Sequence, residues 1–123
     1  MKILIVEDEP NNMMLMKIIL KKHGHEPVEA FTGAQGIAKA SESKPDIVLM
    51  DLRLPDIEGF EVTRSIKKMW KDIPIIAVTS YSMDDVREEI DKGGFNGLIQ
   101  KPINPGTIMD EIKKILGQKA CGN

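Results

Sequence analysis

Short apolar runs alternate along the chain with segments in which apolar residues recur at helical spacing. Three of the five runs are apolar at every position and rich in β-branched residues, which is typical of strands covered on both faces of a parallel sheet. The other two runs contain Pro27 and Gly97, which favours edge strands. Asn104 and Pro105 predict the N-cap and first turn of the last helix. The pattern predicts strands at 2–6, 26–30, 46–50, 74–78 and 96–100, and helices at 11–23, 33–42, 59–70, 83–92 and 105–116.

This regular alternation predicts an α/β fold, a doubly wound five-stranded parallel sheet with helices on both faces. Right-handed crossovers leave only a few possible strand orders. Because the second and fifth strands have edge character, the flavodoxin-like (βα)5 order 2-1-3-4-5 fits best. The 123 residues suffice for one domain, which we expect at residues 1–117, with a short C-terminal tail at residues 118–123.

Composition and charge narrow the class of function. Hydrophobic residues make up 41% of the chain and charged residues 29%, as in ordinary globular proteins. The net charge of −2 argues against electrostatic binding of nucleic acid or of an acidic membrane surface. The single cysteine, Cys121, can form neither an internal disulfide nor a cysteine metal cage, and no apolar run approaches the ~18 residues of a membrane span. We therefore expect a cytoplasmic domain whose function lies in a site or a surface.

Polar side chains directly follow four of the five predicted strands. Glu7 and Asp8 follow the first strand and Asp51 the third, while Thr79 and Lys101 follow the fourth and fifth. In a sheet of this order, ligands bind at the carboxyl ends of the strands, beside the switch point between the first and third. Three carboxylates gathered there repel one another unless a proton or a cation neutralises them. Oxygen ligands without nearby His or Cys favour Mg²⁺, or alternatively Mn²⁺.

Together these groups favour the transfer of a phosphoryl group onto a carboxylate. A partly hydrated cation, the Lys101 ammonium and the Thr79 hydroxyl can all contact phosphoryl oxygens. Asp51 is the central acid, and we therefore assign it as the nucleophile. Taken singly, each residue also has an ordinary structural explanation. Glu7 and Asp8 could complement a helix dipole, Asp51 could cap a turn, and the other two could be structural or surface residues.

Four motifs resemble the signature of response-regulator receiver domains, the CheY-like superfamily of two-component signal transduction. They are Ile-Val-Glu7-Asp8, Leu-Met-Asp51-Leu-Arg-Leu-Pro55-Asp-Ile-Glu-Gly59, Val-Thr79-Ser80 and Lys101-Pro102. The resemblance covers essentially the whole chain. It implies that Asp51 accepts a phosphoryl group from a sensor histidine kinase or a histidine phosphotransfer protein in a Mg²⁺-dependent reaction. It also implies that the domain catalyses only its own phosphorylation and dephosphorylation.

The resemblance implies roles for the metal ligands around Asp51. Asp8 resembles the direct Mg²⁺ ligand, and Glu7 resembles the acidic partner that acts mainly through water. The main-chain carbonyl of Arg53 would complete the protein ligands, together with the carboxylate of Asp51.

The resemblance also implies a phosphorylation switch. Thr79 resembles the hydroxyl residue that moves toward the phosphoryl group, and Lys101 resembles the lysine that pairs with it. A cis peptide bond is implied between Lys101 and Pro102, where it would direct the lysine into the pocket. Receivers often carry Tyr or Phe three residues before this lysine, and that ring moves in or out of the fold on phosphorylation. This chain has Leu98 there, so we do not expect such a movement of an aromatic ring.

Two further pairs of residues suggest how the site is tuned and recognised. Arg53 and Tyr81 lie two residues beyond Asp51 and Thr79, and we expect them at the pocket mouth. Their bulk and a cation–π contact would slow the attack of water on an acyl phosphate. Met14 and Ile18 fall on the lysine side of the helix at 11–23, where an exposed patch suits a partner helix that presents a histidine. The alternative is that these two are only partly exposed packing residues.

The helix at 83–92 has only Val86 and Ile90 as apolar anchors, so we expect it to be the bistable element. Phosphorylation would change the surface formed by the fourth helix, fifth strand and fifth helix, where a downstream protein target would bind. We expect a monomer or a weak phosphorylation-dependent dimer, with neither a nucleic-acid nor a membrane partner. Because the sequence ends soon after the last helix, no output domain is expected.

Three alternative functions remain open. The first is an aspartyl-nucleophile phosphohydrolase, although Arg53 stands where such enzymes typically have a second acid. The second is a pseudo-receiver that binds partners without being phosphorylated. The third is a receiver fragment of a larger regulator or of a hybrid kinase. Asn12, four residues after Asp8, has a weak resemblance to the pattern in receivers of hybrid kinases and in single-domain cell-cycle regulators.

Overall fold

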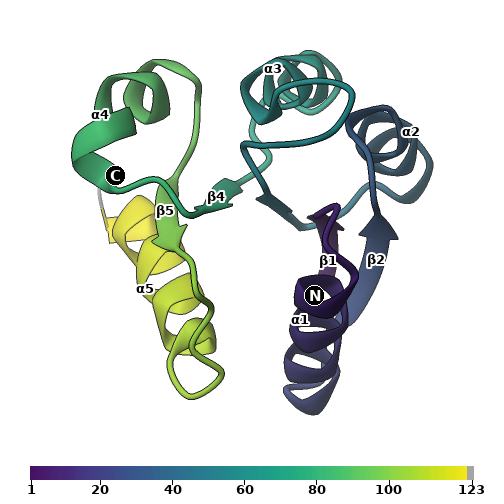
Figure 1. Ribbon diagram of the computed structural model, residues 1–123, viewed down its shortest axis with the longest axis vertical. Coiled ribbons are helices and arrows are strands. Elements are labelled where there is room, and N and C mark those ends of the chain that lie inside the picture. Colours follow the sequence, from purple (N-terminus) through teal and green to yellow (C-terminus); the bar gives the residue numbers. More distant parts are fainter. Residues whose placement is uncertain (122–123) are drawn as a thin grey trace.

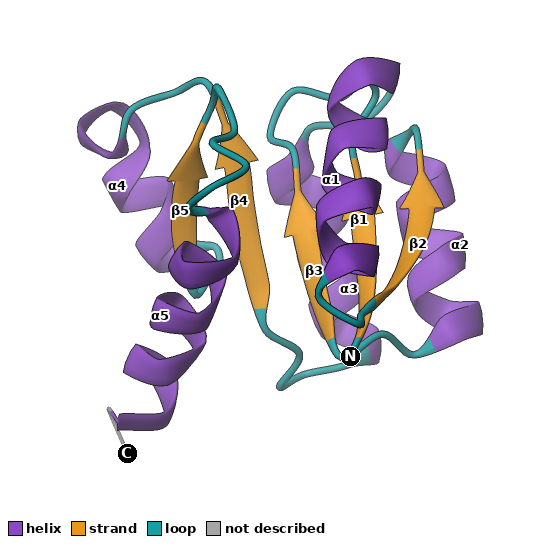
Figure 2. Cartoon of the chain, turned by 90° about the horizontal axis from the view of Figure 1, so that it is seen from below, coloured by secondary structure: helices purple, strands orange, loops and turns teal. Residues whose placement is uncertain are grey.

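Five parallel strands form the single sheet of the structure, a computed structural model that describes the backbone of residues 1–121 and the side-chain surroundings of residues 1–117. The strands lie in the order β2-β1-β3-β4-β5, as predicted, with β2 and β5 at the edges (Figure 2). Their bounds are β1 Lys2–Val6, β2 Glu26–Ala30, β3 Ile47–Met50, β4 Ile75–Thr79 and β5 Gly97–Gln100. The observed bounds therefore agree with the predicted strands to within one residue.

Within residues 1–121, five helices cover the two faces of this sheet. Their bounds are α1 Pro10–Lys22, α2 Gly33–Ser43, α3 Gly59–Met69, α4 Met83–Lys92 and α5 Ile108–Cys121. Helices α1 and α5 lie on one face, and α2, α3 and α4 lie on the other (Figure 1). No helix in the described part of the chain is long and apolar enough to span a membrane.

The apolar core is divided unequally between the helices. Side chains of β1, β3 and β4 that point to one face pack under α1 and α5, and a second cluster packs under α2 and α3. Only a small cluster lies under α4, whose two buried residues are Val86 and Ile90. Because buried apolar area is the main stabilising contribution to packing, α4 is held to the sheet more weakly than its neighbours.

The last helix differs from its prediction at both ends. It begins at Ile108 and not at residue 105, because Asn104 forms a turn of its own. The Asn104 side chain accepts a hydrogen bond from the Gly106 N–H at 2.9 Å, and its main-chain carbonyl accepts from the N–H groups of Thr107 and Ile108. Such local bonds compete with helix formation, so Pro105 lies in the turn before the helix. The helix then continues to Cys121, beyond the predicted end at residue 116.

The first helix also begins one residue earlier than predicted. Pro10 occupies its first turn, where the missing N–H of proline costs no hydrogen bond. Glu9 is the N-cap, and its carboxylate accepts a hydrogen bond from the Asn12 N–H at 3.0 Å. The helix therefore begins directly after the acidic pair Glu7-Asp8, at the carboxyl end of β1.

Candidate functional site

Three carboxylates meet where β1 and β3 end. Val6 pairs with Met50 in the parallel ladder, so the acids that follow them leave the sheet at the same level. Oxygens of Glu7, Asp8 and Asp51 all lie within 4.8 Å of one another. Glu7 is 1% exposed and Asp51 5% exposed, whereas Asp8 is open to solvent. The sequence prediction that these acids form one cluster is therefore confirmed.

Lys101 brings a positive charge to this cluster from the far side of β4. Its Nζ lies 2.7 Å from the Glu7 Oε1 and 3.1 Å from the Asp51 Oδ2. The ammonium therefore contacts the two buried carboxylates directly. The Lys101-Pro102 peptide bond is cis, as the resemblance implied.

Burial and charge act in opposite directions on the Glu7–Lys101 pair. Burial raises the pKa of Glu7 above its usual value, although hydrogen bonds from Lys101 and the Glu9 N–H oppose this shift. Burial alone would lower the pKa of Lys101, but contacts with Glu7 and Asp51 outweigh it and raise that pKa. The lysine therefore remains a cation at neutral pH, close to the central carboxylate.

The Asp51 carboxylate is held on both oxygens. Its Oδ1 accepts a hydrogen bond from the Arg53 N–H at 3.1 Å, while its Oδ2 faces Lys101. The loop that follows is closed at Gly59, whose N–H donates to the Leu52 carbonyl at 3.0 Å. A Cβ atom at position 59 would collide with the main-chain oxygen of Asp51, so only glycine fits there. These contacts fix the orientation of the acid.

Thr79 lies at the end of β4, between the strands that carry Asp51 and Lys101. It pairs with Gln100 in the ladder, and its carbonyl accepts from the Lys101 N–H at 2.7 Å. Its side chain is 1% exposed, and its Oγ1 accepts a hydrogen bond from the Tyr81 N–H at 3.3 Å. The hydroxyl therefore lies at the carboxyl end of the sheet, the same end as the three acids, and its own proton is available for donation.

Arg53 and Tyr81 form a contact across two loops. The Arg53 Nε donates a hydrogen bond to the Tyr81 Oη at 2.7 Å, and the guanidinium carbon lies 4.8 Å from the ring centroid. The guanidinium thus makes both a hydrogen bond and the expected cation–π contact. Both residues come from the loops that follow the strands of Asp51 and Thr79.

Met14 and Ile18 project from α1 into solvent. Their side chains are 63% and 59% exposed, among the most exposed large apolar side chains of the described residues. Lys17, which lies between them in sequence, pairs with Glu29 on β2 at 2.9 Å. Met14 and Ile18 therefore form an exposed apolar patch on α1 and are not part of the core.

Asp56 has a role that the sequence did not indicate. Its carboxylate accepts hydrogen bonds from the N–H groups of Gly33 at 2.8 Å and Ala34 at 3.0 Å, the first residues of α2. These two hydrogen bonds lower the pKa of Asp56 below its usual value, and the bond from Ala34 has the larger effect. They tie the loop after Asp51 to the neighbouring helix. No short-range motif marks this contact, because it joins residues more than 20 positions apart.

Comparison with known proteins identifies the family. The sequence profile of the response regulator receiver domain matches residues 3–113. The chain belongs to this family. Polar-differentiation response regulator DivK of Brucella ovis is 37% identical over 117 residues, which cover 94% of this chain and 95% of that protein.

Two solved receiver structures share the fold. The receiver domain of a sensor histidine kinase from Pseudomonas aeruginosa PAO1 was solved with a magnesium ion coordinated in its active-site cleft. It has a TM-score of 0.83 at 30% identity, covering 94% of this chain and 97% of that chain. Response regulator TrrA from Thermotoga maritima was solved in complex with Mg²⁺-BeF. It has a TM-score of 0.82 at 32% identity, covering 93% and 97% of the two chains.

The acidic cluster of this receiver has the chemistry of a divalent-metal site. Its donors are carboxylate oxygens alone, the type that hard divalent cations prefer. With Glu7, Asp8 and Asp51 ionised, the single charge of Lys101 leaves a deficit of two positive charges, which one divalent cation would balance. Asp8 is the exposed member, through which an ion can enter the site.

We predict that Asp8→Asn weakens the binding of Mg²⁺ or Mn²⁺ about tenfold or more, because a unit charge close to the cation is lost. Isothermal titration calorimetry on the wild type and the variant measures this difference. Asp110→Asn, an exposed acid in the first turn of α5, is the matched control and should bind the metal as the wild type does. Equal affinity of Asp8→Asn and wild type would show that Asp8 is not a ligand.

Proposed function

We propose that Asp51 is the phospho-acceptor of this receiver and takes a phosphoryl group from a histidine kinase or a histidine phosphotransfer protein. The observation that carries the proposal is the position of its carboxylate, which lies within 4.8 Å of oxygens of two further acids and 3.1 Å from the Lys101 ammonium. The chemistry needs a carboxylate nucleophile with positive charge on either side of the incoming group. Residues 1–117 form the receiver domain in this proposal, and residues 118–123 its tail.

In the proposed reaction, a carboxylate oxygen of Asp51 attacks the phosphorus of a phosphohistidine. The new O–P bond forms as the P–N bond breaks, and the electron pair of that bond returns to the imidazole of the donor. Glu7, Asp8, Asp51 and the main-chain carbonyl of Arg53 would hold the cation, with Glu7 acting mainly through water. When bound, Mg²⁺ (or Mn²⁺ in its place) supplies positive charge to the phosphoryl oxygens.

Lys101 and Thr79 then respond to the new group. The phosphoryl group adds negative charge and strong acceptor oxygens beside Asp51. We propose that the Lys101 ammonium pairs with one of these oxygens, and that the Thr79 hydroxyl donates to another. Since the Thr79 Oγ1 accepts from the Tyr81 N–H, its movement would also release the start of the loop that leads to α4.

The output surface in this proposal is the face formed by α4, β5 and α5. Tyr81, Met83 and Leu98 pack against the small cluster that holds α4, so a change at Thr79 is close to the weakest packing in the fold. A shift of α4 would expose a different surface to a downstream protein target. Leu98 repacks in this process without the large rotation of an aromatic ring.

In this proposal the receiver acts in the cytoplasm and binds protein partners, not nucleic acid or membrane. It is a monomer or a weak phosphorylation-dependent dimer. It acts on its own aspartate and has no separate substrate.

Incubation with acetyl phosphate and Mg²⁺ tests the proposed function directly. Intact-mass analysis should show one added phosphoryl group on the wild type and none on Asp51→Asn, because only the carboxylate is nucleophilic. Asp56→Asn, in the same loop, is the matched control and should still be phosphorylated. A wild type that gains no mass, or an Asp51→Asn variant that gains it equally, would contradict the assignment. Multiple turnover of unrelated phosphomonoesters would instead indicate a phosphohydrolase.

Arg53 and Tyr81 should set the lifetime of the acyl phosphate. We expect Arg53→Ala to shorten that lifetime about two- to fivefold, because the loss of the cation–π contact opens the pocket mouth to water. Loss of the phosphorylated mass with time, after removal of the donor, measures the rate. Arg64→Ala, an exposed arginine on α3, should leave the lifetime unchanged. An unchanged lifetime in Arg53→Ala would show that Arg53 does not protect the acyl phosphate from water.

The Met14 and Ile18 patch should contact the phosphodonor protein. Replacing both residues by Lys should slow phosphotransfer from a histidine kinase or phosphotransfer protein about tenfold, because two apolar contacts are lost. Labelling by acetyl phosphate should not change, since the acidic site is intact. Ala38→Lys with Ser41→Lys, at two exposed positions of α2, is the control. Equal slowing by both double variants would show that the phosphodonor protein does not bind specifically at the Met14 and Ile18 patch.

A further inference from the structure

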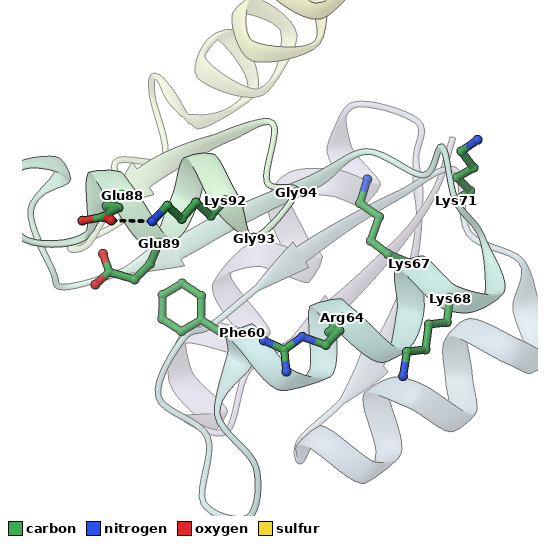
Figure 3. A pocket seen from close by; sticks show the side chains of 10 residues that line it. All are labelled: Phe60, Arg64, Lys67, Lys68, Lys71, Glu88, Glu89, Lys92, Gly93 and Gly94. Atoms are coloured by element: carbon green, nitrogen blue, oxygen red, sulfur yellow. Dashed lines mark hydrogen bonds and ion pairs between the residues drawn. The ribbon is translucent and has the colours of Figure 1, made fainter.

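A groove between α3 and α4 is separate from the acidic site and has no role in the proposed phosphotransfer. Its volume is about 820 Å³, which is within the range of small-molecule sites. Figure 3 shows Phe60 near one end, beside Glu89 and Arg64, and the lysines of α3 toward the other. The groove thus combines an aromatic ring, carboxylates and a group of cations.

The charges in this groove are distributed unevenly. At one end, Glu88 pairs with Lys92 at 2.6 Å, while Glu89 makes no ion pair with any described residue. At the other end, Lys68 and Lys71 are exposed and likewise form no ion pair within the described part of the chain. These two lysines therefore have ammonium groups that a ligand can bind without breaking an existing ion pair.

Two other cations of the groove are already engaged. Arg64 pairs with Glu61 at 3.0 Å, and the Lys67 ammonium donates to the Ile73 carbonyl at 2.6 Å. The charge of Lys67 still adds to the positive potential at the end that carries Lys68 and Lys71, whereas Arg64 lies toward Phe60. The groove therefore attracts an anion to the end that carries Lys68 and Lys71.

Phe60 is fixed at the other end by an edge-to-face contact with Phe95, with ring centroids 5.7 Å apart. The ring is only partly buried and lines the groove, so a planar group can stack on it. Along α3, Phe60 and Lys68 are separated by about 12 Å of helix rise. A ligand that uses both ends therefore needs a planar group and an anionic group at opposite ends of one molecule.

We propose that this groove binds a purine nucleoside polyphosphate. The base would stack on Phe60, and the carboxylate of Glu89 would accept hydrogen bonds from its amino or ring N–H groups. The phosphates would extend toward Lys68 and Lys71, which bind them as point charges. A uniformly acidic peptide fits less well, because Glu89, which makes no ion pair with any described residue, would repel it at the Phe60 end. None of the residues that line the groove belongs to the acidic site, so the proposal does not require that Asp51 accept a phosphoryl group.

Calorimetric titration of the full chain with ATP and GTP, in EDTA, tests the proposal without metal at the acidic site. We expect at least one of these nucleotides to bind about tenfold more tightly than adenosine, guanosine or tripolyphosphate, because each of those lacks one end of the ligand. Chemical shifts of the Gly93 and Gly94 amides, which line the groove, should change more on binding than that of the Asp51 amide. An acidic peptide is titrated in parallel.

Variants locate the binding site. Lys68→Gln with Lys71→Gln should weaken nucleotide binding about tenfold, whereas the matched pair Lys39→Gln with Lys114→Gln should not. Phe60→Leu should weaken it about fivefold or more, and thermal melting checks that this variant is folded. Equal affinity for nucleotide and tripolyphosphate, preference for the acidic peptide, or equal loss in both lysine pairs would overturn the proposal. So would the absence of any nucleotide binding, whether or not Asp51 accepts a phosphoryl group.

Discussion

Repulsion among carboxylates is the constraint on which this receiver depends. Two unit charges about 4 Å apart repel by roughly 4 kcal/mol at an effective dielectric near 20. The sheet brings three acids to one edge and buries two of them, so their charges are poorly screened. Lys101 offsets part of this repulsion through its contacts with Glu7 and Asp51. The remaining negative charge makes the site receptive to a divalent cation, and through that cation to an anionic phosphoryl group.

Rigid and weakly packed parts of the fold have different roles around this charge. The apolar side chains of β1 and β3 are almost fully buried, which fixes the main-chain positions from which Glu7 and Asp51 leave the sheet. Helix α4 has two buried anchors and a short loop to Thr79. A change of charge at Asp51 cannot easily deform the strands, so its effect is concentrated where few apolar contacts resist it.

Much of the fold and acidic cluster could be predicted, because the deciding features are local. Fully apolar runs mark the central strands, and parallel topology brings the residues that follow them together, which placed Lys101 beside Asp51 correctly. The start of α5 was predicted wrongly because the Asn104 side chain closes a turn that competes with the helix. The Asp56 contact with α2 and the α3–α4 groove could not be predicted, since each joins side chains distant in sequence whose meeting depends on helix packing.

The groove and the acidic site share α4 as a structural element. Glu88 and Glu89 of α4 line the groove, and the cluster under α4 includes Leu52, the residue after Asp51. If a ligand in the groove binds one position of α4 more tightly than another, it changes the population of that position. The same coupling free energy must then act in reverse, so phosphorylation of Asp51 would change the affinity of the groove by the same factor. Because α4 is weakly packed, it can change position when the few contacts under Val86 and Ile90 rearrange.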